Sequence, residues 1–231
     1  MFKRKIGMMG VAAALLFGTH GAMADPLILN FSNNAGSALT FLGTGTGVSF
    51  DFGANPDFKI TSISGPWTGA PTDLLSGLQG DILGLFSYST ASIVSMAGLQ
   101  TAPVTSAGGE LVVHDGSGFD LTAALSWVDI QTFGTIGGLD ASGTIDLSGF
   151  SYGGNNSQLM QLANYGDTTV AATFQFVPAQ SLSDLASGTH STSFSGSLNA
   201  VPEPSSWFCL AIGAVAMVWV GRRRRAAAKV S

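Results

Sequence analysis

Short stretches of alternating apolar and polar residues run along most of this chain. In residues 169–176, with the sequence TVAATFQF, every second residue from Val170 to Phe176 is apolar. Successive side chains of a strand point to opposite faces, so this alternation gives a strand with one dry and one wet face. Such strands are typical of antiparallel sheets that cover a core on one side only.

Ten segments have this strand character: 27–31, 39–42, 48–52, 58–63, 82–88, 110–114, 119–130, 143–147, 168–177 and 191–198. The tetrapeptide 115–118, Asp-Gly-Ser-Gly, lies between two of them and predicts a hairpin. Short helices are expected at 157–165 and 181–187, the second followed by Gly188 as a C-cap. The sequence therefore predicts one mainly β domain over residues 25–200. We expect an antiparallel, jelly-roll-like β-sandwich with one or two short helices and an irregular segment at 65–80.

Composition and charge exclude several classes of protein. The chain has 231 residues, 31 of them glycine, and a single cysteine, Cys209, which excludes a disulfide framework and a cysteine-ligated zinc site. All fourteen acidic residues lie between Asp25 and Glu203, and Lys59 is the one basic residue among them, so residues 25–206 have a net charge of −13. A body of this charge is not expected to bind nucleic acid, which needs clustered Lys and Arg.

The first 24 residues have the organisation of a signal peptide. Residues 3–5 are Lys-Arg-Lys, residues 6–17 form an apolar stretch, and Ala22 and Ala24 precede Asp25 in the manner of a cleavage site. The alternative, an N-terminal membrane helix, is disfavoured because the apolar stretch is shorter than the roughly 20 residues of a span. We expect the mature chain to begin near Asp25.

The C-terminal region has three parts. Pro202, Glu203 and Pro204 form an extended strip, residues 207–220 are apolar with Trp207 and Trp219 near their ends, and basic residues follow, namely Arg222, Arg223, Arg224 and Arg225. A helix of this length spans about 21 Å at about 1.5 Å per residue, against a hydrocarbon core of about 30 Å. We expect a short membrane helix and a cytoplasmic tail at 226–231. A simple single-pass anchor remains an alternative, because arginine snorkelling and bilayer thinning accommodate the mismatch.

This order of parts resembles the PEP-CTERM sorting signal of Gram-negative bacteria. The resemblance covers residues 201–225 and implies recognition by an exosortase, processing at or near Pro202-Glu203-Pro204, and delivery from the inner membrane to the cell surface or exopolysaccharide matrix. The tail after Arg225 extends slightly past the usual ending. Residues 125–130 and 142–147 are also similar to an uncharacterised group of such proteins, for which the resemblance implies no activity.

Candidate chemistry in the body is sparse. His114, Asp115 and Ser117 are the residue types of a hydrolase triad, but neighbours on one hairpin are not expected to converge. Solvated loops are the expected role of Asp115 and Asp120. A calcium contact there is an alternative, although residues 115–120 do not follow the helix–loop–helix calcium pattern. Trp67, in the sequence Gly-Pro-Trp-Thr-Gly, is the candidate for stacking on a sugar.

These observations predict a non-enzymatic, exported cell-surface or matrix protein without a cofactor, calcium being the possible exception. Its precursor is expected to sit in the inner membrane with its body in the periplasm. The expected partners are an exosortase, transiently the inner membrane, and exopolysaccharide. An adhesion module that binds carbohydrate or calcium is the alternative, and a secreted glycoside hydrolase with paired carboxylates is a weaker one.

Overall fold

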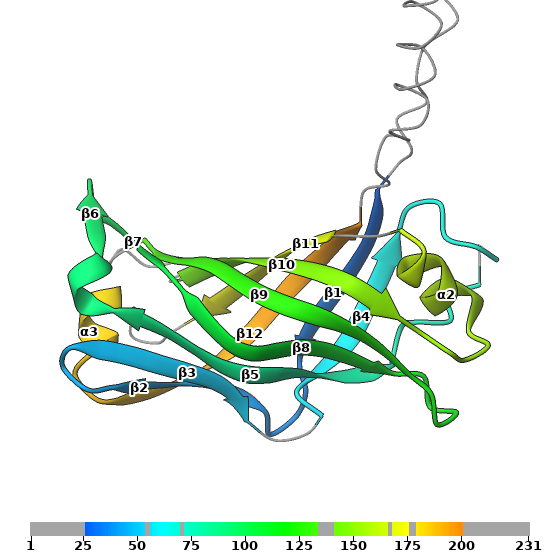
Figure 1. Ribbon diagram of the computed structural model, residues 1–231, viewed down its shortest axis with the longest axis horizontal. Helices are drawn as coiled ribbons and strands as arrows, with labels where there is room; N and C mark the ends of the chain where they lie inside the picture. Colours follow the sequence, from blue (N-terminus) through cyan, green and yellow to red (C-terminus); the bar gives the residue numbers. More distant parts are fainter. Residues whose placement is uncertain are drawn as a thin grey trace, which may run out of the picture.

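The computed structural model describes residues 26–53, 56–69, 72–133, 141–165, 168–175 and 179–200. Its strands are β1 (Leu27–Asn33), β2 (Ala38–Gly43), β3 (Gly47–Gly53), β4 (Phe58–Ser64), β5 (Gln79–Ser89), β6 (Val94–Met96), β7 (Leu99–Pro103), β8 (Thr105–His114), β9 (Asp120–Thr132), β10 (Ala141–Ser151), β11 (Thr168–Gln175) and β12 (Thr189–Ala200). Two short α-helices, α2 (Ser157–Ala163) and α3 (Leu182–Leu185), and the 3-10 turn η1 (Thr90–Ser92) complete it (Figure 1).

The strands form a closed barrel. Antiparallel pairing leads from β1 through β12, β11, β10, β9, β8, β5 and β4 back to β1. The mainly β, antiparallel prediction is confirmed. The jelly-roll-like sandwich is wrong, because the hydrogen-bonded path returns to its first strand instead of separating into two sheets.

Two long strands, β12 and β5, close the barrel because each pairs with two successive strands along the same edge. The first four residues of β12, from Thr189, pair with β2, and its later residues up to Ala200 pair with β1. In the same way β5 pairs with β4 at its start and with β3 at its end. The hairpin of β2 and β3 therefore completes the wall at one end, and the pair β1 and β4 completes it at the other (Figure 1).

Aromatic side chains fill one half of the interior. Trp127 is 1% exposed, and its ring centroid lies 5.0 Å from that of Phe50 in an edge-on arrangement. Phe52 and Phe194 meet in the same way at 4.8 Å. Gly143 on β10 makes room for the indole, because a Cβ at this position would lie 2.4 Å from Cζ2 of Trp127. The barrel is thus a packed core.

The helices predicted from the sequence are confirmed and lie at opposite ends of the barrel (Figure 1). Leu182 and Leu185 of α3 are fully buried, and the Tyr88 hydroxyl donates a hydrogen bond to the Leu182 carbonyl over 2.9 Å. Leu159 and Leu162 of α2 are likewise fully buried. Each helix therefore closes one mouth of the barrel with leucine side chains.

Replacing Ser181 by alanine is expected to lower the free energy of unfolding by about 1 kcal/mol. Its hydroxyl accepts the Asp184 N–H, and the Asp184 carboxylate accepts the Ser181 N–H, which forms a capping box on α3. Chemical denaturation measures the loss. Ser181→Asn keeps an acceptor and should recover most of it; equal losses in both variants would contradict the capping role.

The ten predicted strands correspond to β1 to β5 and β8 to β12, and the hairpin at 115–118 joins β8 to β9 as expected. Sequence reasoning missed the hairpin of β6 and β7. Its turn uses Ala97 and Gly98, both with positive φ of 50° and 86°, and Val94 and Met96 of β6 are 63% and 72% exposed. This hairpin has no buried apolar row, so the alternation that reveals the other strands is absent.

Candidate functional site

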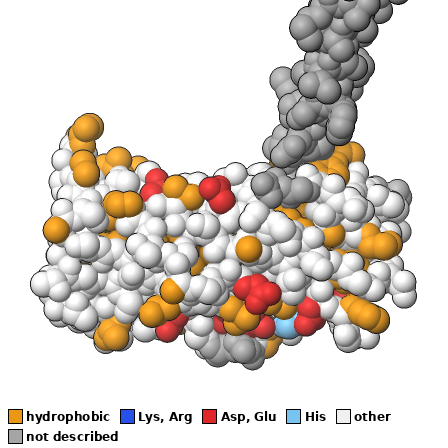
Figure 2. Space-filling model, viewed as in Figure 1, with side chains coloured by type: hydrophobic (Ala, Val, Ile, Leu, Met, Phe, Trp, Pro, Cys, Tyr) orange, Lys and Arg blue, Asp and Glu red, His pale blue; other side chains and the backbone are white. Residues whose placement is uncertain are grey.

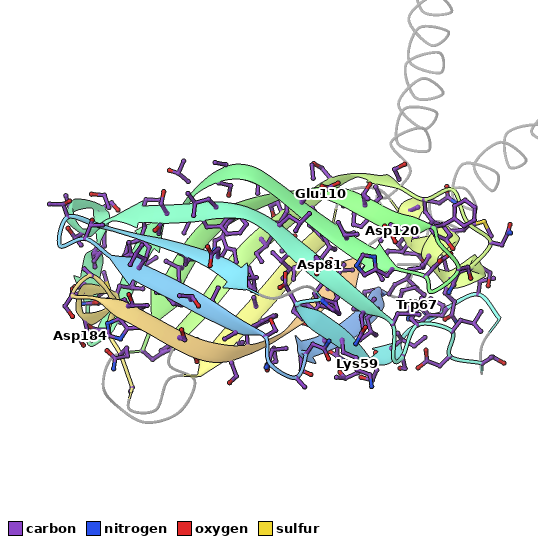
Figure 3. All side chains as sticks on the ribbon, turned by 90° about the horizontal axis from the view of Figure 1, so that it is seen from below. Lys59, Trp67, Asp81, Glu110, Asp120 and Asp184 are labelled. Atoms are coloured by element: carbon purple, nitrogen blue, oxygen red, sulfur yellow. The ribbon has the colours of Figure 1, made fainter. Side chains whose placement is uncertain are left out.

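Four titratable side chains meet where β5, β8 and β9 lie side by side. His114 on β8 contacts Asp81 on β5 through Nε2 and Asp120 on β9 through Nδ1, each over 2.9 Å. Asp57, directly before β4, lies behind Asp81 and is fully buried. We call Asp57, Asp81, His114 and Asp120 the Asp–His cluster; Figure 3 shows Asp81 and Asp120 close together, and Figure 2 shows acidic side chains around a histidine on the surface.

The two inner carboxylates hold the backbone where β4 and β5 begin to pair. The Asp57 N–H donates to Oδ1 of Asp81 over 3.2 Å, and the Ile82 N–H donates to Oδ2 of Asp57 over 2.9 Å. The remaining oxygen of Asp57, Oδ1, is buried and has no hydrogen-bond partner within the described part of the chain. The cluster therefore joins two strands and leaves one buried acceptor unsatisfied, which is unfavourable for an ionised carboxylate.

The environment changes the proton affinities in the cluster. Burial, reinforced by the negative charges of Asp81 and Asp51, raises the pKa of Asp57 to about 6, although the Ile82 N–H opposes the change. The hydrogen bond to Asp120, followed by that to Asp81, raises the pKa of His114 despite some desolvation. Both groups therefore hold their protons to higher pH in the folded state than in an exposed setting.

Sequence reasoning found only the outer half of this cluster. His114 and Asp120 flank the predicted hairpin, whereas Asp57 and Asp81 are 24 residues apart and come together only through the pairing of β4 with β5. One available signal is that each of these aspartates directly borders an apolar strand segment, Phe58 or Ile82, where an acid is uncommon.

Asp115 stabilises the hairpin turn and does not join His114. Its Oδ1 accepts the N–H groups of Ser117 and Phe119, and its Oδ2 accepts the Tyr152 hydroxyl over 2.8 Å. Although desolvation acts against it, these hydrogen bonds lower the pKa of Asp115. The expectation that His114, Asp115 and Ser117 do not form a triad agrees with this geometry, because His114 pairs with two other aspartates.

The structure overturns the stacking prediction for Trp67. The Trp67 side chain is only 4% exposed, and its Nε1 donates to the Ser64 carbonyl over 2.8 Å. Two glutamines of α2 fix the loop around it: Gln161 donates to the Pro66 carbonyl, and Gln158 to the carbonyl of Thr68. The sequence Gly-Pro-Trp-Thr-Gly is indeed a loop, but α2 holds it inward, so the ring presents no face to a sugar.

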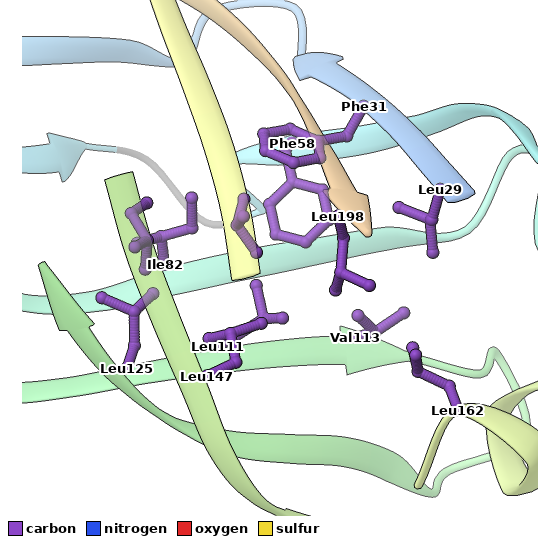
Figure 4. Close-up of a pocket in the computed structure, with 12 residues that line it drawn as sticks. Leu29, Phe31, Phe58, Ile82, Leu111, Val113, Leu125, Leu147, Leu162 and Leu198 are labelled. Carbon is purple, nitrogen blue, oxygen red and sulfur yellow. The ribbon is translucent and has the colours of Figure 1, made fainter. Parts of the chain in front are cut away.

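The interior offers little space for a ligand. A cavity of about 20 Å³ lies among aliphatic and aromatic side chains from the β1 and β4 half, including Leu29, Phe58, Val113 and Leu162 (Figure 4). That is room for about one water molecule, and an apolar lining offers water no partners. This cavity, among the residues that the structure describes, is therefore too small and too apolar to serve as a ligand chamber.

Metal ligands do not gather in the described ranges. Across residues 26–200, apart from the undescribed gaps, no three His, Cys, Asp or Glu side chains are arranged to hold a metal ion. Asp115 and Asp120 are engaged with protein groups, as shown above. A calcium contact at these aspartates thus stays a prediction that this geometry does not favour.

The predicted targeting segments lie outside the described residues. These are the cleavage site at Ala22, Ala24 and Asp25, the motif Pro202-Glu203-Pro204, and the predicted membrane segment with Trp207, Trp219 and Arg222, Arg223, Arg224 and Arg225. Among the helices that the structure does describe, none has the length and hydrophobicity to cross a bilayer.

The body is an antiparallel barrel with one short helix at each end, and the sequence continues beyond its last strand. Residues 200–225 match the family model of the PEP-CTERM protein-sorting motif. The chain is thus a protein with a PEP-CTERM sorting motif, which implies export and recognition by an exosortase. Neither a curated protein nor a solved structure is significantly similar to the chain.

Proposed function

We propose that this protein is an exported cell-surface or extracellular-matrix component of a Gram-negative bacterium, without catalytic activity. The observation that carries the proposal is the sorting motif at residues 200–225, directly after the last strand of the barrel. In this proposal the signal peptide exports the chain, residues 207–220 hold the precursor in the inner membrane with its body in the periplasm, and an exosortase processes it at Pro202-Glu203-Pro204.

The packed barrel supports a structural or binding role for the body. The described part of its interior is packed with apolar side chains, and the Asp–His cluster joins strands β5, β8 and β9. Both features suit a durable extracellular module, whereas a hydrolase needs a cleft that brings two acids to one substrate.

The test is the C-terminal residue of the released protein, determined by mass spectrometry. We expect an extracellular product that lacks residues 207–231. Replacing Pro202, Glu203 and Pro204 by alanine should leave the full-length precursor in the membrane fraction, and alanines at Ser205 and Ser206 serve as the matched control. An extracellular product with residues 222–231 intact would overturn the proposal.

A further inference from the structure

An open groove runs across the outer surface of the barrel at its α3 end. It has a volume of about 550 Å³, within the range of small-molecule sites. The lining residues come from the β2–β3 turn, β3, β5, η1, β7 and β8, and comprise Thr44, Thr46, Gly47, Val48, Ser49, Ser87, Tyr88, Ser89, Ser92, Pro103 and Thr105. Seven of these are serine or threonine, and none is charged.

The floor of the groove is formed by β3, β5 and β8, and the pairing of these strands places three of the hydroxyl residues in one row. Ser87 on β5 is directly paired with Ser49 on β3 and with Thr105 on β8. Neighbouring strands lie about 4.7–4.9 Å apart, so the three side chains form an evenly spaced row on one face. Gly47, which pairs with Ser89, adds no side chain and keeps the floor low.

The rim of the groove consists of the β2–β3 turn and η1, which are held together by hydrogen bonds. The Thr90 N–H and hydroxyl both donate to the Thr46 carbonyl, over 3.1 and 3.0 Å, and tie η1 to the β2–β3 turn. The Thr44 hydroxyl donates to the Gly47 carbonyl over 3.1 Å and closes that turn. A groove with a fixed rim loses little conformational entropy when it binds a ligand.

The floor hydroxyls retain their hydrogen-bonding capacity. Within the described chain the hydroxyl groups of Ser49, Ser87 and Thr105 make no hydrogen bond to another protein group. A hydroxyl both donates and accepts, so such a row matches a ligand that is itself rich in hydroxyls. The methyl groups of the threonines and the ring of Pro103 supply apolar contacts beside them.

Charge excludes the acidic ligands. Anionic groups are usually bound by Arg or Lys, and Lys59, the one such residue in the described chain, lies on β4, which does not line the groove. The net charge of −13 over residues 25–206 also repels polyanions.

We infer that the groove binds a neutral glycan chain through the row Ser49, Ser87 and Thr105. This inference extends the proposed export, because an exported body meets glycans, but it is tested separately.

The experiment is affinity electrophoresis of the purified protein in native gels that contain dextran, laminarin, hydroxyethylcellulose or alginate. We expect retardation by at least one of the three neutral glucans and none by alginate. Tyr88, the one aromatic residue of the lining, is 4% exposed, so binding should depend on the hydroxyls. The triple variant Ser49→Ala, Ser87→Ala, Thr105→Val should weaken the retardation constant at least tenfold.

The matched control makes the same chemical changes on outward positions of β10, β11 and β12: Ser148→Ala, Thr169→Val and Ser193→Ala. It should bind as the wild type does, with circular dichroism confirming that both triple variants fold. Ser87→Glu, which places a charge in the middle of the floor, should abolish binding by itself. The inference is overturned if no neutral glucan retards the protein, if alginate alone does, or if the groove and control variants are retarded equally. None of these results depends on C-terminal processing.

Discussion

Replacing Trp127 by alanine is expected to lower the free energy of unfolding by about 3–5 kcal/mol, the cost typical of a large side chain removed from a core. The indole is 1% exposed and contacts the rings of Phe50, Phe52 and Phe86. Its Nε1 also donates to the Asp129 carbonyl over 2.7 Å, which the variant leaves without this donor. Urea unfolding followed by circular dichroism measures the change.

The control for this variant is Val128→Thr at the next position of the same strand. Val128 points to the outside and is 43% exposed, so exchanging it for a residue of the same shape should change stability by less than about 0.5 kcal/mol. Comparable losses in the two variants would show that β9 is in the wrong register, because a shift of one residue exchanges the two faces.

Asp57→Asn is expected to stabilise the protein at neutral pH by up to about 3 kcal/mol, at about 1.4 kcal/mol for each unit of pKa. The pKa of this carboxyl is about 6 in the folded protein against an ordinary 3.8, so the folded state binds more protons than the unfolded state between these values. Stability of the wild type therefore falls as the pH rises through this window, and stays lower above it. The asparagine has no proton to lose, so its advantage should be absent near pH 4, grow as the pH rises to about 6, and be complete above that value.

His114 adds to the same slope in the wild type. Because its pKa is raised in the folded protein, its contribution is present below its ordinary pKa of 6.5 and is lost as the pH rises through the folded value. Unfolding curves at a series of pH values test both effects. Asp115→Asn is the contrasting variant: hydrogen bonds lower the pKa of that carboxyl, so the change should not stabilise the protein at neutral pH. A pH profile of Asp57→Asn that matches the wild type would contradict the assignment.

Local structure followed closely from the sequence, whereas the closure of the barrel did not. Alternation locates strands such as β11, and the Asp-Gly-Ser-Gly turn locates the β8–β9 hairpin. Alternation specifies faces but not partners, and closure depends on β5 and β12 each pairing with two strands along one edge. A sandwich and a barrel present the same alternating pattern, so the choice between them lies in long-range pairing.

In the candidate sites, too, contacts between residues near in sequence were predictable and contacts between distant strands were not. Asp120 and His114 are near in sequence, and both are candidates from the sequence alone, but Asp81, the hydrogen-bond partner of the other histidine nitrogen, is 33 residues away on another strand. Trp67 has the sequence context of an exposed loop, but it is buried, and two glutamines of the distant helix α2 hold the loop in this position. The hydroxyl row in the groove arises from register across three strands, which single-strand patterns do not encode.

The pairing of β1 with β12 has a consequence for secretion. Leu27 is paired with Ala200, so the first and last strands are neighbours and the wall is complete only when the final strand is in place (Figure 1). A chain truncated before residue 189 lacks both the closing strand and the sorting motif that follows it. A truncated chain of this kind therefore loses the complete barrel wall and the motif for exosortase recognition together.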